Sequence, residues 1–311
     1  MPSQVLVAGL MIKNRYHVRN KLGEGKFGEV YKAYDKVEKM DVALKAVATV
    51  NTVEDKEDAS AIGEARILLL LNKNKCKGSP QLYDYFSYKS HSLLVMELFK
   101  TDFHQLLKNH PKKSFSKQSL LHFGYHVIVA IKSIHQIGII HRDIKPANIF
   151  LRNHQTNSMK LVIGDLGMAV KFESGFEKPG MRIRVAARDF DFSKSPYHSL
   201  GMAEGRAAQE SDDLEMIAYM VMYARGIRPF VGSVTEMIAK RKELHQNPGN
   251  MVRGNNGWLK TIVELLLNQE YGSTPRYQEI LDEIASHSRI PASRDFQVVV
   301  NTDGTSYLKD F

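Results

Sequence analysis

The chain has 311 residues, of which 43% are hydrophobic and 25% charged, which is typical of a folded globular protein and excludes a disordered or fibrous class. Its single cysteine, Cys76, cannot form an internal disulfide, so a disulfide-stapled secreted fold is excluded and a cytosolic or nuclear location is expected. The net charge of +9 is compatible with nucleic acid, an anionic membrane or an acidic or phosphorylated protein as partner.

Other features of the sequence reduce the number of possible partners. No segment is long and apolar enough to predict a membrane-spanning helix. The chain carries no helix-turn-helix, zinc-finger spacing or RNP aromatic pattern. We therefore expect no nucleic-acid or membrane partner, and we expect a monomer. Cys76 lies among lysines that could lower its pKa, but an inert, half-buried thiol is the simpler interpretation.

The first third of the chain predicts strands and one helix. The apolar stretch at residues 5–12 is expected to pack as an N-terminal strand or extension. Strands with β-branched and aromatic residues between polar turns are predicted at residues 16–22, 29–34, 41–47, 82–88 and 92–98. A helix is predicted over residues 55–72, because acidic residues crowd its start and apolar residues then recur at helical spacing.

From about residue 102 the pattern becomes helical. Helices are predicted at residues 103–109, 117–137, 212–225, 235–247, 258–268 and 276–286. From Ile290 the chain is polar and non-periodic, which predicts a tail that either lies on the domain or is disordered. This order predicts an α+β fold. Its expected parts are an N-terminal extension (1–15), one domain (16–285) with an antiparallel strand lobe (16–97) and a helical lobe (98–285), and a C-terminal tail (286–311).

A glycine-rich turn joins the first two predicted strands, with the G-x-G-x-x-G spacing at Gly23, Gly25 and Gly28. Phosphate oxygens need backbone N–H donors at close range, and glycine permits that approach. The spacing also occurs in dinucleotide-binding loops, but those open a helix, whereas a strand follows here. The turn therefore predicts a strand–loop–strand cover over the phosphates of a nucleotide.

A lysine on the next strand, Lys45, can reach these phosphates if an acid holds its ammonium group. We choose Glu64 on the following helix, with Glu57 and Glu54 near the helix start as alternatives. Taken singly, Lys45 is a solvated strand lysine and Glu64 a surface helix acid. Their order after the glycine turn favours an ion pair.

The most specific motif is H-R-D-I-K-P-A-N at residues 141–148. Asp143 can accept a hydrogen bond from a substrate hydroxyl and orient it toward a terminal phosphate. Lys145 supplies positive charge where the transferred phosphoryl group develops negative charge. Asn148 can ligate a magnesium ion through its amide oxygen, a hard ligand for a hard cation.

A second acidic motif, G-D-L-G at residues 164–167, follows an apolar run. Asp165 is the expected second magnesium ligand. The residue after it is leucine, which is apolar and can pack inward. Alone, such a motif predicts an ordinary turn, but its order after the preceding motif favours a metal-binding role.

A pocket for the nucleotide base is predicted around the connector between the lobes. Backbone groups of Glu97, Leu98 and Phe99 are expected to hydrogen-bond the adenine edge. Apolar side chains are expected to enclose the ring: Leu22, Val30 and Ala43 above it, Phe150 below it and Met96 behind it. Plain core packing is the alternative for each, and the two roles are compatible.

These motifs resemble the protein kinase superfamily, and more closely its casein kinase I group. The pointers to that group are residues 95–98, the motif at 141–148 with isoleucine at 144, and residues 211–215, which open a helix. The N-terminus, with Gly-Leu-Met-Ile at 9–12, is similar to the tau-tubulin kinase branch. The resemblance covers roughly residues 5–285.

The resemblance implies a two-lobed protein kinase fold, ATP with Mg²⁺, and transfer to serine or threonine of protein substrates. It also implies a preference for acidic or already phosphorylated substrates. By the same resemblance, Asp213 starts the helix that anchors the catalytic loop from below.

The chain departs from the casein kinase I group after the G-D-L-G motif. The group's G-T-x-R-Y and S-I-N stretches are replaced, and about five extra residues lie between His198 and Asp212 by our alignment. Arg188 is a candidate for the arginine that contacts a substrate phosphate. The basic run containing Lys240 and Arg241 is a candidate for the other half of such a site, with ordinary solvated residues as the alternative. Arg-Pro-Phe at 228–230 replaces the group's L-P-W. These changes concern substrate docking more than ATP chemistry.

Four functions compete on this basis. An active serine/threonine kinase is favoured, because every group that the chemistry needs is present. A catalytically weak pseudokinase-type scaffold that binds protein partners is supported only by the altered segment. No motif in the chain supports the function of a basic nucleic-acid-binding protein. A small-molecule kinase fits the extended motif at residues 141–148 less well than a protein kinase does.

Overall fold

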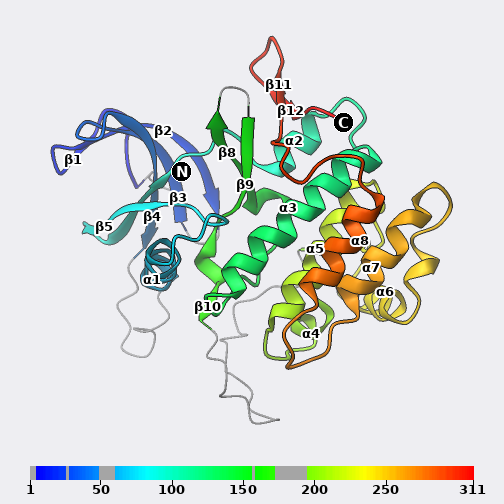
Figure 1. The fold of residues 1–311 in the computed structure, drawn as a ribbon. Coiled ribbons are helices and arrows are strands. Elements are labelled where there is room, and N and C mark those ends of the chain that lie inside the picture. Colours follow the sequence, from blue (N-terminus) through cyan, green and yellow to red (C-terminus); the bar gives the residue numbers. More distant parts are fainter. Residues whose placement is uncertain (1–4, 26–27, 49–59, 156–157, 172–194) are drawn as a thin grey trace.

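The computed structural model describes residues 5–25, 28–48, 60–155, 158–171 and 195–311 (Figure 1). Figure 1 shows a strand-rich lobe formed by the first third of the chain and a helical lobe formed by the rest. This confirms the predicted two-lobed α+β fold.

The strand-rich lobe is one curled antiparallel sheet in the order β1-β2-β3-β4-β6-β5. Its strands are β1 (Met11–Ile12), β2 (Tyr16–Gly25), β3 (Gly28–Asp35), β4 (Met40–Ala48), β5 (Leu82–Tyr88) and β6 (His91–Glu97). Residues 5–12 pack on this sheet, because Leu6 and Ile12 are buried and β1 pairs with β2. The N-terminal stretch is therefore an added edge of the sheet, as expected.

Helix α1 (Ser60–Lys73) accompanies this sheet and contacts β4, β5 and β6. Its buried residues Leu68 and Leu71 join the larger of the two hydrophobic cores, which extends into the helical lobe. The sequence predicted this helix from residue 55, and residues 55–59 lie outside the described residues. Helix α1 thus belongs by position to the strand lobe and by packing to both lobes.

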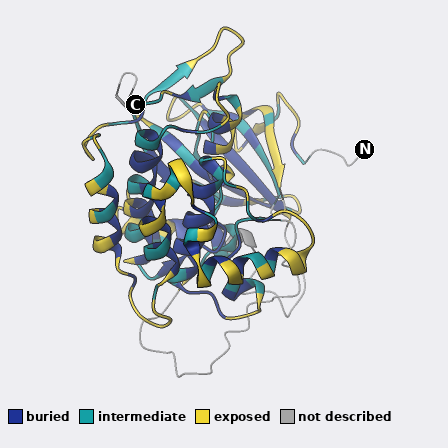
Figure 2. Cartoon of the chain, turned by 90° about the vertical axis from the view of Figure 1, so that its right-hand side faces the viewer, coloured by how far each residue is buried: buried dark blue, intermediate teal, exposed yellow. Residues whose placement is uncertain are grey.

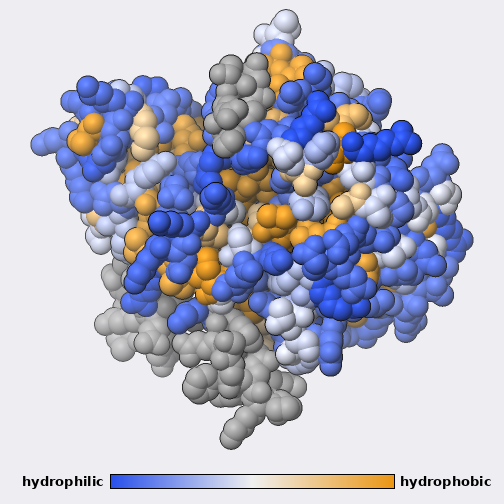
Figure 3. Space-filling view, in the orientation of Figure 1, coloured by the Kyte–Doolittle hydropathy of each residue, from blue (hydrophilic) through white to orange (hydrophobic). Residues whose placement is uncertain are grey.

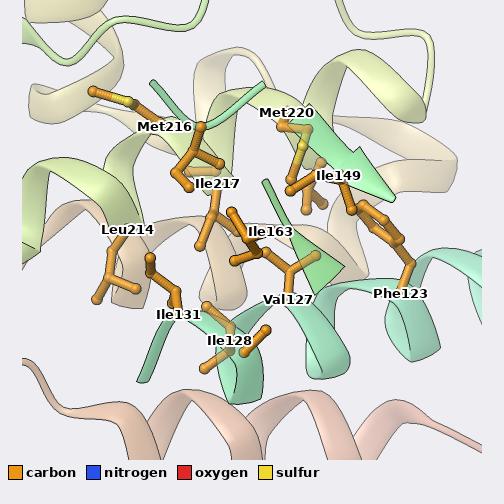
Figure 4. Packing of buried hydrophobic residues seen from close by; sticks show 14 of the residues in the cluster. Phe123, Val127, Ile128, Ile131, Ile149, Ile163, Leu214, Met216, Ile217 and Met220 are labelled. Atoms are coloured by element: carbon orange, nitrogen blue, oxygen red, sulfur yellow. The ribbon is translucent and has the colours of Figure 1, made fainter. Parts of the chain in front are cut away.

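The helical lobe is built around α3 and α5. Its longer helices are α2 (Phe103–Asn109), α3 (Lys117–His135), α5 (Glu210–Ala224), α6 (Val234–Gln246), α7 (Lys260–Leu267) and α8 (Tyr277–His287). Shorter elements are α4 (Leu200–Ala203) and the strands β7 (Ile139–Ile140), β8 (Ile149–Gln155), β9 (Ser158–Ile163) and β10 (Val170–Lys171). Side chains of α3 and α5 meet in the core shown in Figure 4, and Figure 2 shows the buried faces of the helices turned inward. No described helix is long and apolar enough to cross a membrane.

The C-terminal tail lies on the helical lobe, which was the first of the two predicted alternatives. It forms a hairpin of β11 (Val298–Val300) and β12 (Ser306–Leu308) beside α2 (Figure 1). Phe296 is buried against the rings of His122 and His126 of α3. Asp310 accepts hydrogen bonds from the Ser116 N–H and the Ser119 hydroxyl at the start of α3. The tail therefore covers one side of α3 through a few specific contacts.

Gly124 offers a test of the packing around α3. It lies inside the helix and lines a small internal cavity, and a Cβ added there would meet only Ile284 Cδ1, at 3.9 Å. Alanine is the better helix former and restricts the unfolded chain more than glycine does. We expect Gly124→Ala to raise the free energy of unfolding by about 0.5–1 kcal/mol. Urea unfolding followed by circular dichroism measures this change.

Gly78→Ala is the matched comparison. A Cβ at this position would lie 2.8 Å from the carbonyl oxygen of Ala130, so backbone would have to move. We expect this variant to lose stability. Equal stability of the two alanine variants would contradict the packing described here.

Acid is expected to loosen the contact between α3 and the tail. Burial lowers the pKa of His122 and of His126 to about 4 in the folded protein, whereas an unfolded histidine titrates near 6.5. Between these values the unfolded chain binds more protons, so stability is full above about pH 6.5 and falls as the pH drops toward 4. Urea midpoints measured between pH 7.5 and 4.5 should fall, and the fall should be smaller in His122→Leu/His126→Leu. An equal fall in both proteins would assign the effect to other groups.

Candidate active site

Lys45 lies at the centre of a buried group of charges. Its Nζ is 3.0 and 2.7 Å from the two carboxylate oxygens of Glu64 and 2.7 Å from Oδ1 of Asp165. The Lys45 side chain is 8% exposed and that of Glu64 is 1% exposed. The structure therefore brings together the lysine of β4, the acid chosen on α1 and the aspartate that follows β9. The alternative acids Glu54 and Glu57 lie outside the described residues.

These contacts favour the charged forms of Lys45 and Asp165, whereas burial raises the pKa of Glu64 despite the neighbouring ammonium group. Burial alone would lower the pKa of Lys45, but the carboxylates of Glu64 and Asp165 outweigh it and raise that pKa. Burial alone would raise the pKa of Asp165, but the ammonium group of Lys45 outweighs it and lowers that pKa. The site thus holds a fixed cation next to a fixed anion, which suits binding of phosphates and of a metal ion.

Asp143 lies in the loop between β7 and the 3₁₀ turn η1 (Pro146–Asn148). Its Oδ2 accepts hydrogen bonds from Lys145 Nζ at 2.7 Å and from Asn148 Nδ2 at 3.0 Å. The two contacts leave Oδ1 as the oxygen that can accept a proton from a substrate. The three residues of the most specific sequence motif therefore converge on one carboxylate.

Asp213 holds this loop in place from the first turn of α5. Its Oδ2 accepts hydrogen bonds from the His141 N–H at 2.7 Å and from His135 Nε2 at 2.8 Å. Its Oδ1 accepts the Arg142 N–H at 2.8 Å. A buried carboxylate thus satisfies two backbone donors of the catalytic loop, which is the geometry that the family resemblance implied. His135 was not singled out from the sequence, since only the fold brings it to Asp213.

Two residues of the site have left-handed backbone conformations that side chains other than glycine rarely adopt: Arg142 has φ 67° and Asp165 has φ 56°. Such strain persists only where the surroundings hold it, and it gathers at functional sites. His141 contributes to holding it, because its Nε2 donates to the carbonyl of Gly164 at 3.0 Å. Leu166 is 1% exposed, so the leucine after Asp165 packs inward as expected.

Asn148 and Asp165 have suitable atoms for magnesium. The amide nitrogen of Asn148 is engaged by Asp143, which leaves its amide oxygen as the available ligand. Asp165 adds a carboxylate, and both are hard oxygen donors. No group of three or more His, Cys, Asp or Glu side chains among the described residues could hold a metal alone. This donor set fits a magnesium ion that is shared between one or two side chains and the phosphates of a nucleotide.

The glycine turn lies at the tip of the β2–β3 hairpin. Gly23 is opposite Val30, and Gly25 is opposite Gly28. Gly28 has φ +124°, and a Cβ there would lie 2.1 Å from the carbonyl oxygen of Ala46, so only glycine fits. The turn's tip, residues 26–27, lies outside the described residues. Leu22 is 48% exposed and thus free to contact a ligand.

The connector presents backbone groups where the adenine edge was predicted. The Glu97 N–H is engaged with the Gln81 carbonyl, and the Glu97 carboxylate pairs with Arg152. Leu98 and Phe99 make no backbone hydrogen bond to any residue that the structure describes, so their N–H and C=O groups remain available for a ligand.

Apolar side chains lie on both sides of this connector. Ala43 of β4 is opposite Met96 of β6, and Phe99 stacks on Phe150 with ring centroids 5.0 Å apart. A Cβ at Gly164, the first residue of the G-D-L-G motif, would lie 2.9 Å from the Phe150 ring, so this glycine also shapes the pocket. Figure 3 shows hydrophobic side chains in the middle of the face between the two lobes.

Of the residues expected to bind a substrate phosphate, the structure describes Lys240 and Arg241. Arg188 lies outside the described residues. Lys240 contacts the Val231 carbonyl. Arg241 is 1% exposed and lies over the rings of Tyr219 and Phe230, so the expectation that it faces a substrate is wrong. It sits on the inward face of α6, where the long aliphatic part of an arginine can be buried.

The Lys45–Glu64 pair gives a test that separates stability from function. Lys45→Met leaves the buried Glu64 carboxylate without its partner, which should cost about 3–5 kcal/mol of stability. In Lys45→Met/Glu64→Leu the Glu64 carboxylate is removed as well, and only Asp165, whose side chain is 31% exposed, loses its cation, so part of this loss should be recovered. Nucleotide binding should be weakened in both variants. Thermal unfolding and titration with a fluorescent ATP analogue measure the two effects.

Lys32→Met is the control, since Lys32 is a partly exposed lysine of the neighbouring strand and pairs with Asp41. It should change neither quantity appreciably. A double variant that stays as unstable as Lys45→Met would contradict a mutual stabilisation of the two charges.

Comparison with known proteins agrees with this geometry. Residues 16–190 match the protein kinase domain family. The chain is 32% identical over 151 residues to dual specificity tyrosine-phosphorylation-regulated kinase 3 of Homo sapiens, a match that covers 48% of this chain and 25% of that protein. It is 25% identical over 300 residues to a probable casein kinase I homolog of Encephalitozoon cuniculi, covering 90% of each chain. It is 29% identical over 149 residues to serine/threonine-protein kinase AFC1 of Arabidopsis thaliana, covering 47% of this chain and 31% of that one.

The chain spans about a quarter of the length of the dual-specificity kinases that it matches. The family match extends over more than half of the chain and includes the glycine turn, Lys45, Asp143 and Asp165. With the two-lobed fold and the convergence of these residues on one site, it shows that this chain belongs to the protein kinase domain family.

Proposed function

We propose that the chain is an active protein kinase that transfers the γ-phosphate of ATP to serine or threonine hydroxyls. The observation that carries the proposal is the complete and connected set of charges around Lys45 and Asp143. The Lys45–Glu64 pair is formed, Asp165 is adjacent to it, and Asp143 keeps one carboxylate oxygen for an acceptor. These contacts hold the side chains that the transfer needs close to one another.

The chemistry follows from these positions. The acceptor hydroxyl donates its hydrogen bond, and then its proton, to Asp143 as its oxygen bonds to the γ-phosphorus. The bond from that phosphorus to the bridging oxygen breaks, and ADP leaves with the bonding electrons. Lys45 binds the phosphates that stay on ADP, and Lys145 offsets negative charge on the transferred group. A magnesium ion held by Asn148 and Asp165 would supply further positive charge to the phosphates.

The substrate class is part of the proposal. We propose that the chain prefers acidic or already phosphorylated protein substrates and belongs to the casein kinase I group, near the tau-tubulin kinase branch. The match to a casein kinase I homolog along 90% of both chains and the net charge of +9 support this assignment. Because several relatives are named dual-specificity kinases, tyrosine is the acceptor that a test must include.

We propose a catalytic domain at residues 16–285, flanked by the N-terminal extension and the C-terminal tail, and a monomer that acts in the cytosol or nucleus. The competing function is a pseudokinase-type scaffold. It rests on the altered segment after Asp165, of which residues 172–194 lie outside the described residues.

Asp143→Asn tests the proposed transfer. An amide cannot take the hydroxyl proton, so we expect the rate of transfer to fall by about 10²–10⁴-fold while ATP still binds. The assay uses labelled ATP with magnesium and offers casein, a phosphate-primed acidic peptide and matched peptides with tyrosine as the acceptor. Phosphoamino-acid analysis then identifies the modified residue.

Asp282→Asn is the control, because Asp282 is an exposed acid of α8, and its rate should equal that of the unmodified protein. Label on tyrosine would correct the proposed specificity. If the unmodified protein binds ATP but transfers nothing to any acceptor, the scaffold function replaces the kinase function.

A further inference from the structure

His198 lies beside the proposed catalytic base. It is 5% exposed, and its Nε2 is 4.0 Å from Oδ1 of Asp143. It lies two residues before α4, in a segment that departs from the casein kinase I group. The two residues are far apart in the sequence, so only the fold brings them together.

The carboxylate oxygen that faces His198 is the one left for a substrate. Lys145 and Asn148 both bond to Oδ2 of Asp143, at 2.7 and 3.0 Å. The 4.0 Å between Oδ1 and Nε2 is too long for a direct hydrogen bond. One oxygen atom at about 2.8 Å from each would fit between them with an angle of roughly 90°. The separation of Nε2 and Oδ1, which we call the acceptor gap, therefore matches one hydroxyl oxygen that bonds to both atoms.

Both sides of this gap are fixed by the first turns of α5. Asp213 holds the loop that carries Asp143, through the backbone of His141 and Arg142. Two other acids of the same helix hold the residues that follow His198. The Ser199 hydroxyl donates a hydrogen bond to Asp212 Oδ1 at 2.7 Å, and the Leu200 N–H donates one to Glu215 Oε1 at 2.7 Å. The separation of His198 from Asp143 is thus set by one rigid element.

We propose that His198 binds the acceptor hydroxyl and orients it for transfer, an inference that rests on the proposed kinase function. His198 donates its Nε2–H to the hydroxyl oxygen, while the hydroxyl donates its hydrogen to Oδ1 of Asp143. When the oxygen bonds to the γ-phosphorus, its proton passes to Asp143, ADP leaves with the electrons of the broken bond, and His198 keeps its own proton. The histidine acts by placing the oxygen lone pair that attacks.

A pair of variants of similar size tests this role. In His198→Gln the side-chain amide can place an N–H donor near the position of Nε2, whereas His198→Leu fills the space without a donor. We expect transfer from saturating ATP to a serine peptide to be about 10- to 100-fold slower in His198→Leu than in the unmodified protein. His198→Gln should regain most of that loss. The affinity for ATP should be unchanged in both, since His198 lies on the acceptor side.

The controls separate this role from a structural one. His122→Leu removes another buried histidine, outside the site, and should lower stability without slowing transfer. The thermal midpoints of His198→Leu and His198→Gln are compared with it, and transfer is measured well below the lower midpoint. Equal rates for the Gln and Leu variants, or a Leu variant as fast as the unmodified protein, would overturn the role of His198. Absence of transfer by the unmodified protein would instead overturn the proposed kinase function.

Discussion

The buried contact of Lys45 with Glu64 and Asp165 is the constraint on which the arrangement of the two lobes depends. The three charges come from β4, from α1 and from the turn after β9, and a buried charge left alone costs several kcal/mol. Helix α1 must therefore lie close to the sheet, and the turn with Asp165 must meet it from the helical lobe. The apolar side of α1 supports this, because Leu68 and Leu71 belong to the same core as α3 and α5.

Helix α5 plays the corresponding part on the acceptor side. Three acids in its first turns are buried, and each bonds to a segment that approaches the site: Asp213 to the catalytic loop, and Asp212 and Glu215 to the residues after His198. These bonds satisfy backbone and hydroxyl donors that would otherwise be buried without a partner. The ATP side and the acceptor side of the site are thus held by different elements.

The sequence predicted what depends on local order and missed what depends on single long-range contacts. The Lys45–Glu64 pair was predictable because a glycine turn, a strand lysine and a helix acid follow one another in a fixed order. Arg241 was assigned to the surface by its charge, although Met237, Arg241 and Leu244 recur at helical spacing and all three are buried on α6. The tail is held on the helical lobe by isolated contacts such as those of Phe296. Such contacts leave no periodic pattern in the sequence, so the position of the tail could not be predicted.

His198 shows why the altered segment concerns the acceptor more than ATP. Nothing in its local sequence relates it to Asp143, and their proximity depends on α5, which binds both of their segments. A change in this segment can move His198, the proposed donor to the acceptor hydroxyl, while the contacts of Lys45 and Asp165 stay as they are. The loss of the casein kinase I pattern near His198 is therefore compatible with intact phosphate chemistry, and its physical effect falls on how a substrate hydroxyl is received.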